Sequence, residues 1–198
     1  MRIIAGTLRG RRIEAPEGLD TRPILDRVKA PLFDWLGSRL ALPGSLPPVN
    51  VCDLYCGPGT HGIEAISRGV AHCVFVDRNP AAAGCLRRNI DALDIASQAT
   101  VLDQPIETVR FPEPNGAPFS IVFFDPPFSL SEDTTTDSPT MRVMTRLATS
   151  LPVTKDAFLT WRHDDHITLP TALPGGWTQI DRRVWRRNAI TFYGQSDA

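Results

Sequence analysis

The sequence predicts an α/β fold: a mostly parallel sheet, covered by helices on both faces, that ends in an antiparallel hairpin. Three features of the chain lead to this prediction. Strand-like and helix-like segments alternate from residue 49 onward, as they do in parallel sheets. A glycine-rich turn follows the first strand of this alternation. Four successive strands end at an aspartate, and ligands of open α/β sheets bind outside those ends.

The first 22 residues precede this alternation and are expected to form a small basic extension. Short strand-like stretches on either side of Leu8-Arg9-Gly10 predict a β-hairpin between residues 2 and 15. We therefore divide the chain into an extension, residues 1–22, and a main domain, residues 23–198. The first 12 residues contain no acid but four arginines: Arg2, Arg9, Arg11 and Arg12.

Residues 24–40 carry apolar side chains at the spacing of one helical face, from Val28 to Leu40. Pro31 removes a helical hydrogen bond, so the helix is expected to begin at Pro31 or to kink there. Residues 41–48 contain three prolines and a glycine and read as a linker.

The main domain then follows in order. Strands are predicted at 49–54, 72–77, 98–103, 119–124, 156–161, 177–184 and 189–193, and helices at 61–69, 79–93 and 138–150. The last two strands have no helix between them and are expected to pair as a hairpin. The polar, acidic segment 129–140 is expected to be a mobile loop.

Composition limits the classes of protein to consider. With 198 residues and 42% apolar content, the chain supports one sizeable domain. The net charge of −1 gives no overall basic field, but arginines gather at both ends and suggest one localised positive face. The second group surrounds Trp185, which could stack on RNA or belong to the core. Its members are Arg182, Arg183, Arg186 and Arg187.

Four cysteines occur without a C-x-x-C pair, which favours reduced, buried thiols in a cytoplasmic protein. No signal peptide opens the sequence, and no apolar run of membrane-spanning length occurs. Residues 161–166 contain two histidines and two aspartates, but they read as a solvated loop rather than a metal site. His61 is interpreted as a capping or packing residue rather than a base.

The turn after the first strand contains Gly57, Gly59 and Gly62, which permit a tight bend, close ligand approach and close helix packing. This spacing also suits a dinucleotide such as NAD. However, Asp53 just upstream would disfavour a pyrophosphate. S-adenosylmethionine carries an ammonium and a sulfonium instead, and the strand-end acids favour it. Asp77 is placed to hold a ribose, and Asp103 to face an adenine amine.

Asp125-Pro126-Pro127-Phe128 follows the fourth strand and forms a rigid lip. Proline lacks an N–H, the aspartate is an acceptor, and the phenylalanine offers a flat face. Acceptors beside a stacking ring suit a planar group that carries an NH2, as a nucleobase does. Taken alone, the same four residues could be an ordinary turn.

Together these segments resemble the RsmD family of bacterial 16S ribosomal RNA guanine-N2 methyltransferases. The resemblance rests on the opening Met1-Arg2-Ile3-Ile4-Ala5-Gly6, on the segment from Thr21 to Leu36, on the glycine turn from Asp53 to Gly69, and on the lip at 125–128. Pro58, His61 and the long acidic loop depart from the family pattern and leave the exact target open.

The resemblance implies a class I S-adenosylmethionine-dependent methyltransferase with a Rossmann-like sheet, acting as a monomer on 16S rRNA of the small ribosomal subunit, without metal or membrane. The implied catalytic residues are Asp125, Pro126, Pro127 and Phe128. The implied cofactor-binding residues are Asp53, Tyr55, Gly57, Gly59, Asp77, Arg78 and Asp103. The implied RNA-binding residues are Arg9, Arg11, Arg12, Arg22 and Arg27.

Two alternatives stay open. One is methylation of another nucleobase amine, such as adenine N6, although an acceptor-only Asp125 suits the adjacent N1–H and N2–H donors of guanine better. The other is an RNA-binding ribosome assembly factor that keeps the fold without turnover.

Overall fold

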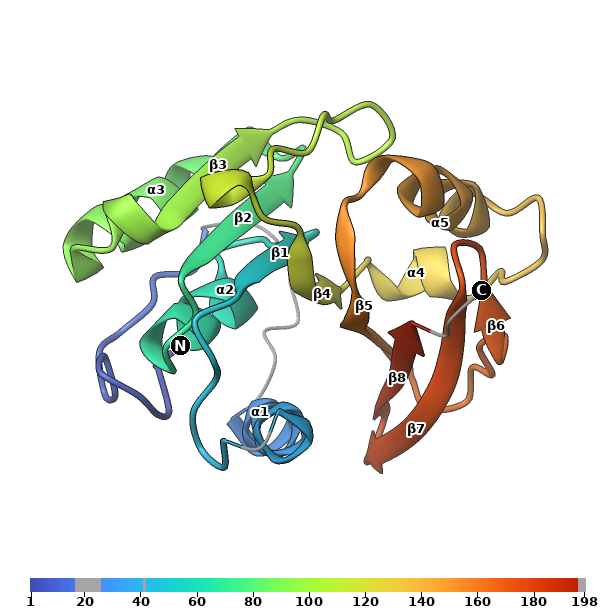
Figure 1. Cartoon of the computed structure of the whole chain (residues 1–198), viewed down its shortest axis with the longest axis horizontal. Helices are drawn as coiled ribbons and strands as arrows, with labels where there is room; N and C mark the ends of the chain where they lie inside the picture. Colours follow the sequence, from blue (N-terminus) through green and yellow to red (C-terminus); the bar gives the residue numbers. More distant parts are fainter. Residues whose placement is uncertain (17–25, 41, 196–198) are drawn as a thin grey trace.

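The computed structural model describes residues 1–16, 26–40 and 42–195 and contains one eight-stranded sheet (Figure 1). The strand order is β3-β2-β1-β4-β5-β8-β7-β6, with β1 to β5 parallel and β6 to β8 antiparallel. The predicted mostly parallel sheet with a C-terminal antiparallel hairpin is thus confirmed. The strands are β1 (Asn50–Leu54), β2 (His72–Asp77), β3 (Ala99–Asp103), β4 (Phe119–Phe124), β5 (Val153–Asp164), β6 (Ala172–Leu173), β7 (Trp177–Trp185) and β8 (Asn188–Gln195).

Helices cover both faces of this sheet, each through its own core. One core joins α1, α2, α3 and the N-terminal segment to the sheet, and the other joins α5 to the opposite face. The helices are α1 (Asp26–Arg39), α2 (Thr60–Ser67), α3 (Pro80–Leu93), α4 (Phe128–Ser131) and α5 (Pro139–Ser150), with short 3-10 turns η1 (Ala96–Gln98) and η2 (Pro114–Gly116). None of the helices in the described ranges has the length and apolarity needed to cross a membrane.

Helix α1 begins at Asp26 and continues through Pro31, so the expected start at Pro31 is wrong. The carbonyl that Pro31 leaves without a helical partner belongs to Arg27, which is exposed to solvent. The helix is held by its apolar face, where Leu32 and Trp35 are buried. The Trp35 ring stacks on Phe192 of β8 at 4.1 Å.

The N-terminal segment, residues 1–16, is a turn-containing loop rather than a regular β-hairpin. Its arms pair through one β-bridge, between Arg2 and Arg12. The amides in between bond to α2 instead, because Glu64 accepts from Ile4 and Ala5. The prediction of a small N-terminal hairpin is therefore right in its reversal of direction and wrong in its two strands.

Two further segments differ from expectation. Helix α4 begins at Phe128, so the long loop predicted for 129–140 is shortened, and Ser131 is anchored by a 3.0 Å hydrogen bond from Trp161. Strand β5 extends to Asp164, so residues 161–164 are not a solvated loop. His163 is fully buried there and contacts Thr191 of β8 at 2.9 Å.

Candidate active site

The carboxyl ends of the central strands meet along one side of the sheet, here called the carboxyl edge. The register sets Asp77 beside Asp103, and Leu54 beside Phe124. Phe124 in turn lies beside Trp161 of β5. The acids at the ends of β2, β3 and β4 therefore share this edge, as the sequence predicts. They are Asp77, Asp103 and Asp125.

Asp53 is buried inside β1 rather than placed at its tip. Oδ2 accepts a hydrogen bond from the Gly62 amide at 2.9 Å. Oδ1 is buried without a hydrogen-bond partner in the part of the chain that the structure describes. Burial raises the pKa of Asp53 well above its usual range, against the opposing effect of the Gly62 amide. One oxygen thus fixes the start of α2, and the other is available to a cationic donor.

Gly57 is the open position of the turn between β1 and α2. Its φ is 53°, and a Cβ built on it would meet nothing within 4 Å. Its amide donates to Oδ2 of Asp77 at 2.8 Å, while Oδ1 of Asp77 accepts from the Asn79 amide at 2.9 Å. Asp77, which is predicted to hold a ribose, therefore also holds the glycine turn in place. The free space at Gly57 lets a ligand approach the backbone closely.

The other two glycines of this turn are required by packing. A Cβ on Gly59 would lie 2.4 Å from Leu86, and a Cβ on Gly62 would lie 2.2 Å from Phe75. The packing role predicted for Gly62 is confirmed. Gly59 was predicted to contact the cofactor, but its α-carbon faces the core, so only its backbone is left for that role.

Tyr55, Arg78 and Asp103 complete the predicted cofactor set. Tyr55 packs edge-on against Phe124 at 5.5 Å, and burial raises its pKa to about 12 although the nearby Arg78 acts in the opposite direction. Asp103 is partly exposed, and its carboxylate lies 3.9 Å from the Arg87 guanidinium. This end of the carboxyl edge is therefore more open than the part around Asp53.

These features fit a ligand that brings positive charge and hydrogen-bond donors. The carboxylates of Asp53, Asp77 and Asp103 would repel a pyrophosphate, whereas they would attract an ammonium or a sulfonium group. A positively charged donor would satisfy the unpartnered Oδ1 of Asp53, because a buried acceptor without a hydrogen bond destabilises the folded protein. The residues present therefore fit S-adenosylmethionine better than a dinucleotide.

Asp125 is held by an arginine, Arg162, that is not among the site residues predicted from the sequence. Arg162 of β5 donates from Nε to Oδ1 of Asp125 at 2.7 Å, and both side chains are largely buried. Arg162 also donates from Nη1 to Oδ1 of Asn188 at 3.2 Å, at the start of β8. One guanidinium thus joins β4, β5 and β8 at the carboxyl edge.

The same arginine lies over the ring of Phe128, 4.9 Å from its centre. Phe128 is half-buried at the first position of α4, and Pro127 immediately before it is exposed. Pro126, which follows Asp125 and precedes Pro127, is buried. The lip predicted at 125–128 is therefore one rigid unit, with its carboxylate and its ring both in contact with Arg162.

His61 lies on the other side of Asp125. Its ring stacks on Phe123 at 5.2 Å, and Nδ1 is 3.8 Å from Oδ2 of Asp125. Burial lowers the pKa of His61 to about 4, although the Asp125 carboxylate opposes this change. The contact is thus not an ion pair at neutral pH, and 3.8 Å is too long for a hydrogen bond. The predicted packing role of His61 agrees with this geometry, and Oδ2 of Asp125 is left without a hydrogen bond among the described residues.

A signal for Arg162 does exist in the sequence. It directly follows the predicted strand 156–161, so in a parallel sheet it emerges at the same edge as Asp125. The link to Asn188 has no such signal, because it depends on the antiparallel register between β5 and β8.

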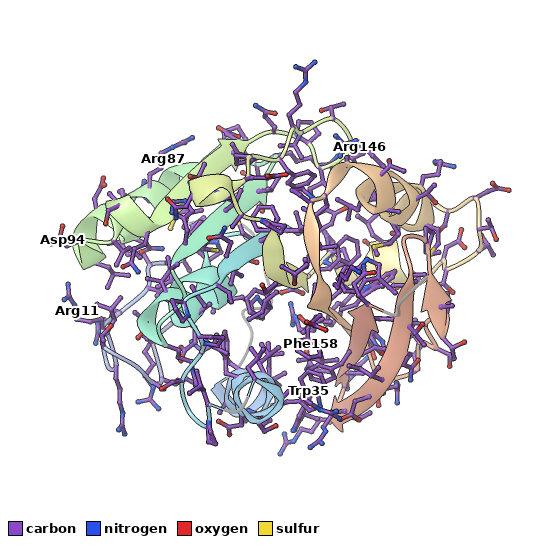
Figure 2. All side chains as sticks on the ribbon, viewed as in Figure 1. Arg11, Trp35, Arg87, Asp94, Arg146 and Phe158 are labelled. Atoms are coloured by element: carbon purple, nitrogen blue, oxygen red, sulfur yellow. The ribbon has the colours of Figure 1, made fainter. Side chains whose placement is uncertain are left out.

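The arginines predicted to bind RNA are not gathered around this site. Thr7 and Leu8 bond to Ser67 at the end of α2, so the neighbouring exposed Arg9 lies away from the carboxyl edge. Arg11 donates to the carbonyl of Ala92 at the end of α3, and Figure 2 shows it at the left margin of the molecule, whereas Phe158 of β5 lies near the middle. Arg12 and Arg27 are exposed, and Arg22 lies outside the described residues.

The two basic groups of the chain are therefore separate. The N-terminal segment packs on α2 and α3, whereas the arginines around Trp185 lie on β7 and in its connection to β8, near the other end of the sheet (Figure 1). Both groups nevertheless border the same core, which contains Ile3, Ile13 and Ile190 with Trp185 packed against it, so one localised positive face stays a prediction.

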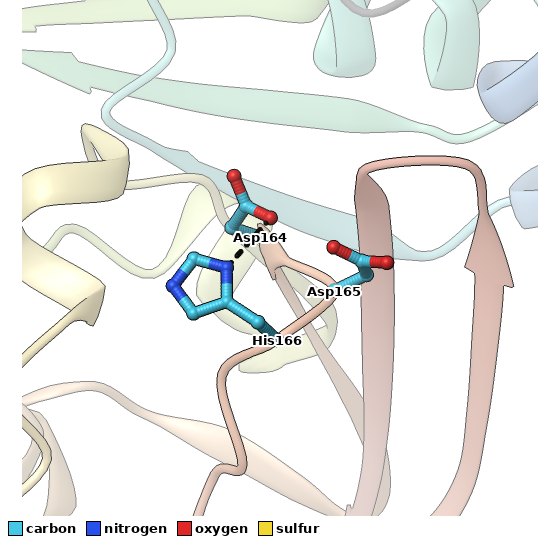
Figure 3. Close-up of side chains that lie close together, drawn as sticks. All are labelled: Asp164, Asp165 and His166. Atoms are coloured by element: carbon cyan, nitrogen blue, oxygen red, sulfur yellow. Dashed lines mark hydrogen bonds and ion pairs between the residues drawn. The ribbon is translucent and has the colours of Figure 1, made fainter.

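Three consecutive side chains at the end of β5 lie close enough to share an ion: Asp164, Asp165 and His166 (Figure 3). Their ligand atoms are within 4.8 Å of one another, and Nδ1 of His166 is 3.0 Å from Oδ1 of Asp164. The cluster is a local turn at which the histidine already pairs with the aspartate. It carries no assignment of a metal.

Comparison with known proteins shows which family this chain belongs to. The profile of the family described as "Conserved hypothetical protein 95" matches residues 1–194. A Bacillus subtilis protein named "Putative rRNA methyltransferase YlbH" is 30% identical over 98% of both chains. "Ribosomal RNA small subunit methyltransferase D" of Escherichia coli is 29% identical, over all of this chain and 94% of its own length.

A solved structure gives the same answer for the fold. The Escherichia coli protein described as "Putative methyltransferase yhhF" superposes with a TM-score of 0.78 at 26% identity, covering 98% of this chain and 97% of its own. With the profile match across nearly the whole sequence, the chain belongs to the RsmD family of S-adenosylmethionine-dependent rRNA methyltransferases.

Proposed function

We propose that this enzyme methylates the exocyclic N2 of a guanine in 16S rRNA of the small ribosomal subunit, as a monomer in the cytoplasm. The observation that supports the choice of base is the ion pair between Asp125 and Arg162. Arg162 is always positive and pairs with the carboxylate through Oδ1, so Asp125 presents acceptors only. Guanine offers the two adjacent donors, N1–H and N2–H, that such a group can accept.

The lip residues then divide the work of holding the base. Oδ2 of Asp125 is free to accept from the target amine, because it makes no hydrogen bond with the described residues and the neutral His61 ring is 3.8 Å away. The carbonyl of Pro126 would accept the second amine hydrogen. Phe128 would stack on the base and fix its plane. These contacts turn the amine lone pair away from the ring system, with which it is otherwise conjugated.

Bound S-adenosylmethionine supplies an electrophilic methyl group beside this amine. Asp53, Gly57, Asp77 and Asp103 would hold it, with the free Oδ1 of Asp53 accepting from its ammonium group. Asp125 is also the nearest acceptor for the proton that the amine gives up. The rate then depends on positioning and on charge placement rather than on a strong base. The base must first leave its stacked position in the RNA to reach the lip.

The N-terminal arginines are proposed to contact RNA away from the target base. Arg9 and Arg11 lie beside the ends of α2 and α3 that are remote from the carboxyl edge. Their contacts would be with phosphates, which position an RNA without reading its sequence.

The test is transfer of a tritiated methyl group to small subunits purified from cells that lack the enzyme, compared with protein-free 16S rRNA. We expect label in the subunit RNA with wild-type enzyme, and none with subunits that already carry the modification. Cofactor binding by calorimetry without any label transfer would contradict the proposal and favour a non-catalytic assembly factor.

A further inference from the structure

A cluster of arginines at the end of the β7–β8 hairpin is not used by the site described above. We call residues 182–187 the hairpin tip. Arg186 and Arg187 form the connection between the two strands, and both are exposed. Val184 beside them is 46% exposed. Neither Arg186 nor Arg187 makes a side-chain hydrogen bond or ion pair with any residue that the structure describes.

The other two arginines of the tip are tied only loosely. Arg182 donates to the backbone carbonyl of Asp165 at 2.6 Å, and Arg183 pairs with Asp181 at 3.1 Å on its own strand. The acids that face the tip from the turn after β5 are Asp164, which is engaged by His166, and Asp165. The outer end of the hairpin therefore keeps an excess of positive charge.

Arg186 has a backbone conformation that only glycine adopts freely. Its φ is 58°, in the left-handed region. A residue with a side chain is less favourable there than glycine, because its Cβ comes too close to the following carbonyl oxygen. An arginine at this strained position places a further cation at the outermost point of the hairpin, where its side chain contributes nothing to the fold.

The sheet register sets this tip beside the candidate active site. Arg162 of β5 is opposite Ile190 of β8, which is opposite Arg183 of β7. Asp125 lies next to Arg162 on the other side, so its backbone is about three strand spacings, roughly 14 Å, from that of Arg183. The hydrogen bond from Arg162 to Asn188 ties the start of β8 directly to the group that holds Asp125.

We infer that the hairpin tip is an RNA-binding surface that holds the phosphates next to the target nucleotide. This rests on the proposed function, since it needs an RNA whose target base sits at Asp125. Unpaired, exposed arginines match phosphates in charge and hydrogen-bond geometry. Arg9 and Arg11 lie at the ends of α2 and α3 that are remote from the carboxyl edge, whereas the tip adjoins that edge.

The test uses two substitutions at the tip, Arg186→Gly with Arg187→Gln, and one matched control. Lys155→Gln also removes an exposed positive charge, but at the other end of β5. We expect the double variant to raise the KM for unmethylated small subunits about tenfold, with kcat and cofactor affinity unchanged. For binding to protein-free 16S rRNA, the slope of the logarithm of the binding constant against the logarithm of the salt concentration should become shallower by about one per arginine removed. Lys155→Gln should behave as wild type.

Four results separate the inference from the alternatives. A thermal midpoint that is equal or higher in the double variant shows that the lost efficiency is not lost folding, because glycine relieves the strain at residue 186. An unchanged KM and salt slope would overturn the hairpin contact while leaving the methyltransferase proposal intact. Weaker binding of the double variant to subunits, without weaker binding to protein-free RNA, would mean that the tip contacts a ribosomal protein. That result would also overturn the inferred contact with RNA. Absence of transfer by the wild type would refute the proposed function itself.

Discussion

At the scale of single residues, the chemistry depends on how Asp125 is oriented. Its carboxylate sits at a strand end, where a free side chain would sample several rotamers. The Arg162 guanidinium fixes Oδ1 at 2.7 Å and also lies over the Phe128 ring. The acceptor and the stacking surface of the lip are therefore positioned by one group. Arg162 is a positioning residue rather than a reacting one.

Replacing Arg162 with alanine should lower kcat by about 100-fold, because misplacement of a reacting group by about 1 Å has effects of that size. The KM for S-adenosylmethionine should not change, since Arg162 does not touch the predicted cofactor residues. Arg162→Lys should recover part of the lost rate, as it keeps the charge but not the forked geometry. A steady-state comparison of the three proteins tests this. Equal kcat values would show that the pair is only structural.

Asp53 makes a second prediction at this scale, in which stability and binding change in opposite directions. Asp53→Asn keeps an acceptor for the Gly62 amide but removes a carboxylate whose burial is costly. We expect a thermal midpoint equal to or a few degrees above that of wild type. S-adenosylmethionine should bind at least about tenfold more weakly, because a charge-assisted hydrogen bond is lost. Scanning calorimetry and titration calorimetry measure the two effects, and unchanged affinity would contradict the role of Asp53.

The sequence predicted these residues unevenly, for a physical reason. Asp125, Pro126, Pro127 and Phe128 are contiguous, so their chemistry could be read as one motif. Arg162 meets Asp125 only through strand pairing. The burial of Asp53 could not be read either, since it depends on α2 folding back over β1.

At the scale of elements, a buried cluster of charges joins the N-terminal segment to the helices beneath it. Glu64 of α2 is fully buried and pairs with Lys29 of α1 at 3.0 Å and with Arg68 at 2.9 Å. It also accepts the amides of Ile4 and Ala5. These bonds anchor the segment to α2 and add to the antiparallel pairing between its two arms. A prediction from alternation alone could not include them, because the acceptor is about 60 residues away.

Glu64→Gln should destabilise the fold by about 3–5 kcal/mol, because it leaves the buried Lys29 without a counter-charge and the buried Arg68 with only the exposed Asp34 at 4.0 Å. Urea unfolding measures this. The control is Glu14→Gln, whose partner Arg88 is 64% exposed, and for which we expect a change below about 0.5 kcal/mol. Similar effects of the two substitutions would show that the buried cluster does not hold the segment.

At the scale of the whole molecule, the topology and the packing role of His61 were predictable, whereas the burial of His163 was not. Alternating segments between 49 and 124 gave the parallel half of the sheet, and the closing pair of strands gave the hairpin. The burial of His61 and His163 comes from packing between elements that are distant in the chain. Burial lowers the pKa of each to about 4.

Stability should therefore fall as the pH falls from about 6.5 toward 4. In this window the unfolded chain binds protons at both histidines while the folded chain does not, so protons favour unfolding. Each pKa unit corresponds to about 1.4 kcal/mol. Asp53 contributes with the opposite sign, since its pKa is raised in the folded state. His163→Asn isolates one histidine: its unfolding midpoint should depend less on pH than that of wild type. An equal dependence would refute the assignment.

The central claim is that Asp125, held by Arg162, selects guanine N2. The most direct measurement is the identity of the methylated nucleoside, obtained by digesting labelled small-subunit RNA and separating the products by mass spectrometry. We expect N2-methylguanosine with the wild-type enzyme. With Asp125→Ala we expect no methylated nucleoside, even at a saturating concentration of S-adenosylmethionine that this variant still binds. N6-methyladenosine from wild-type enzyme, or retained turnover by Asp125→Ala, would contradict the central claim.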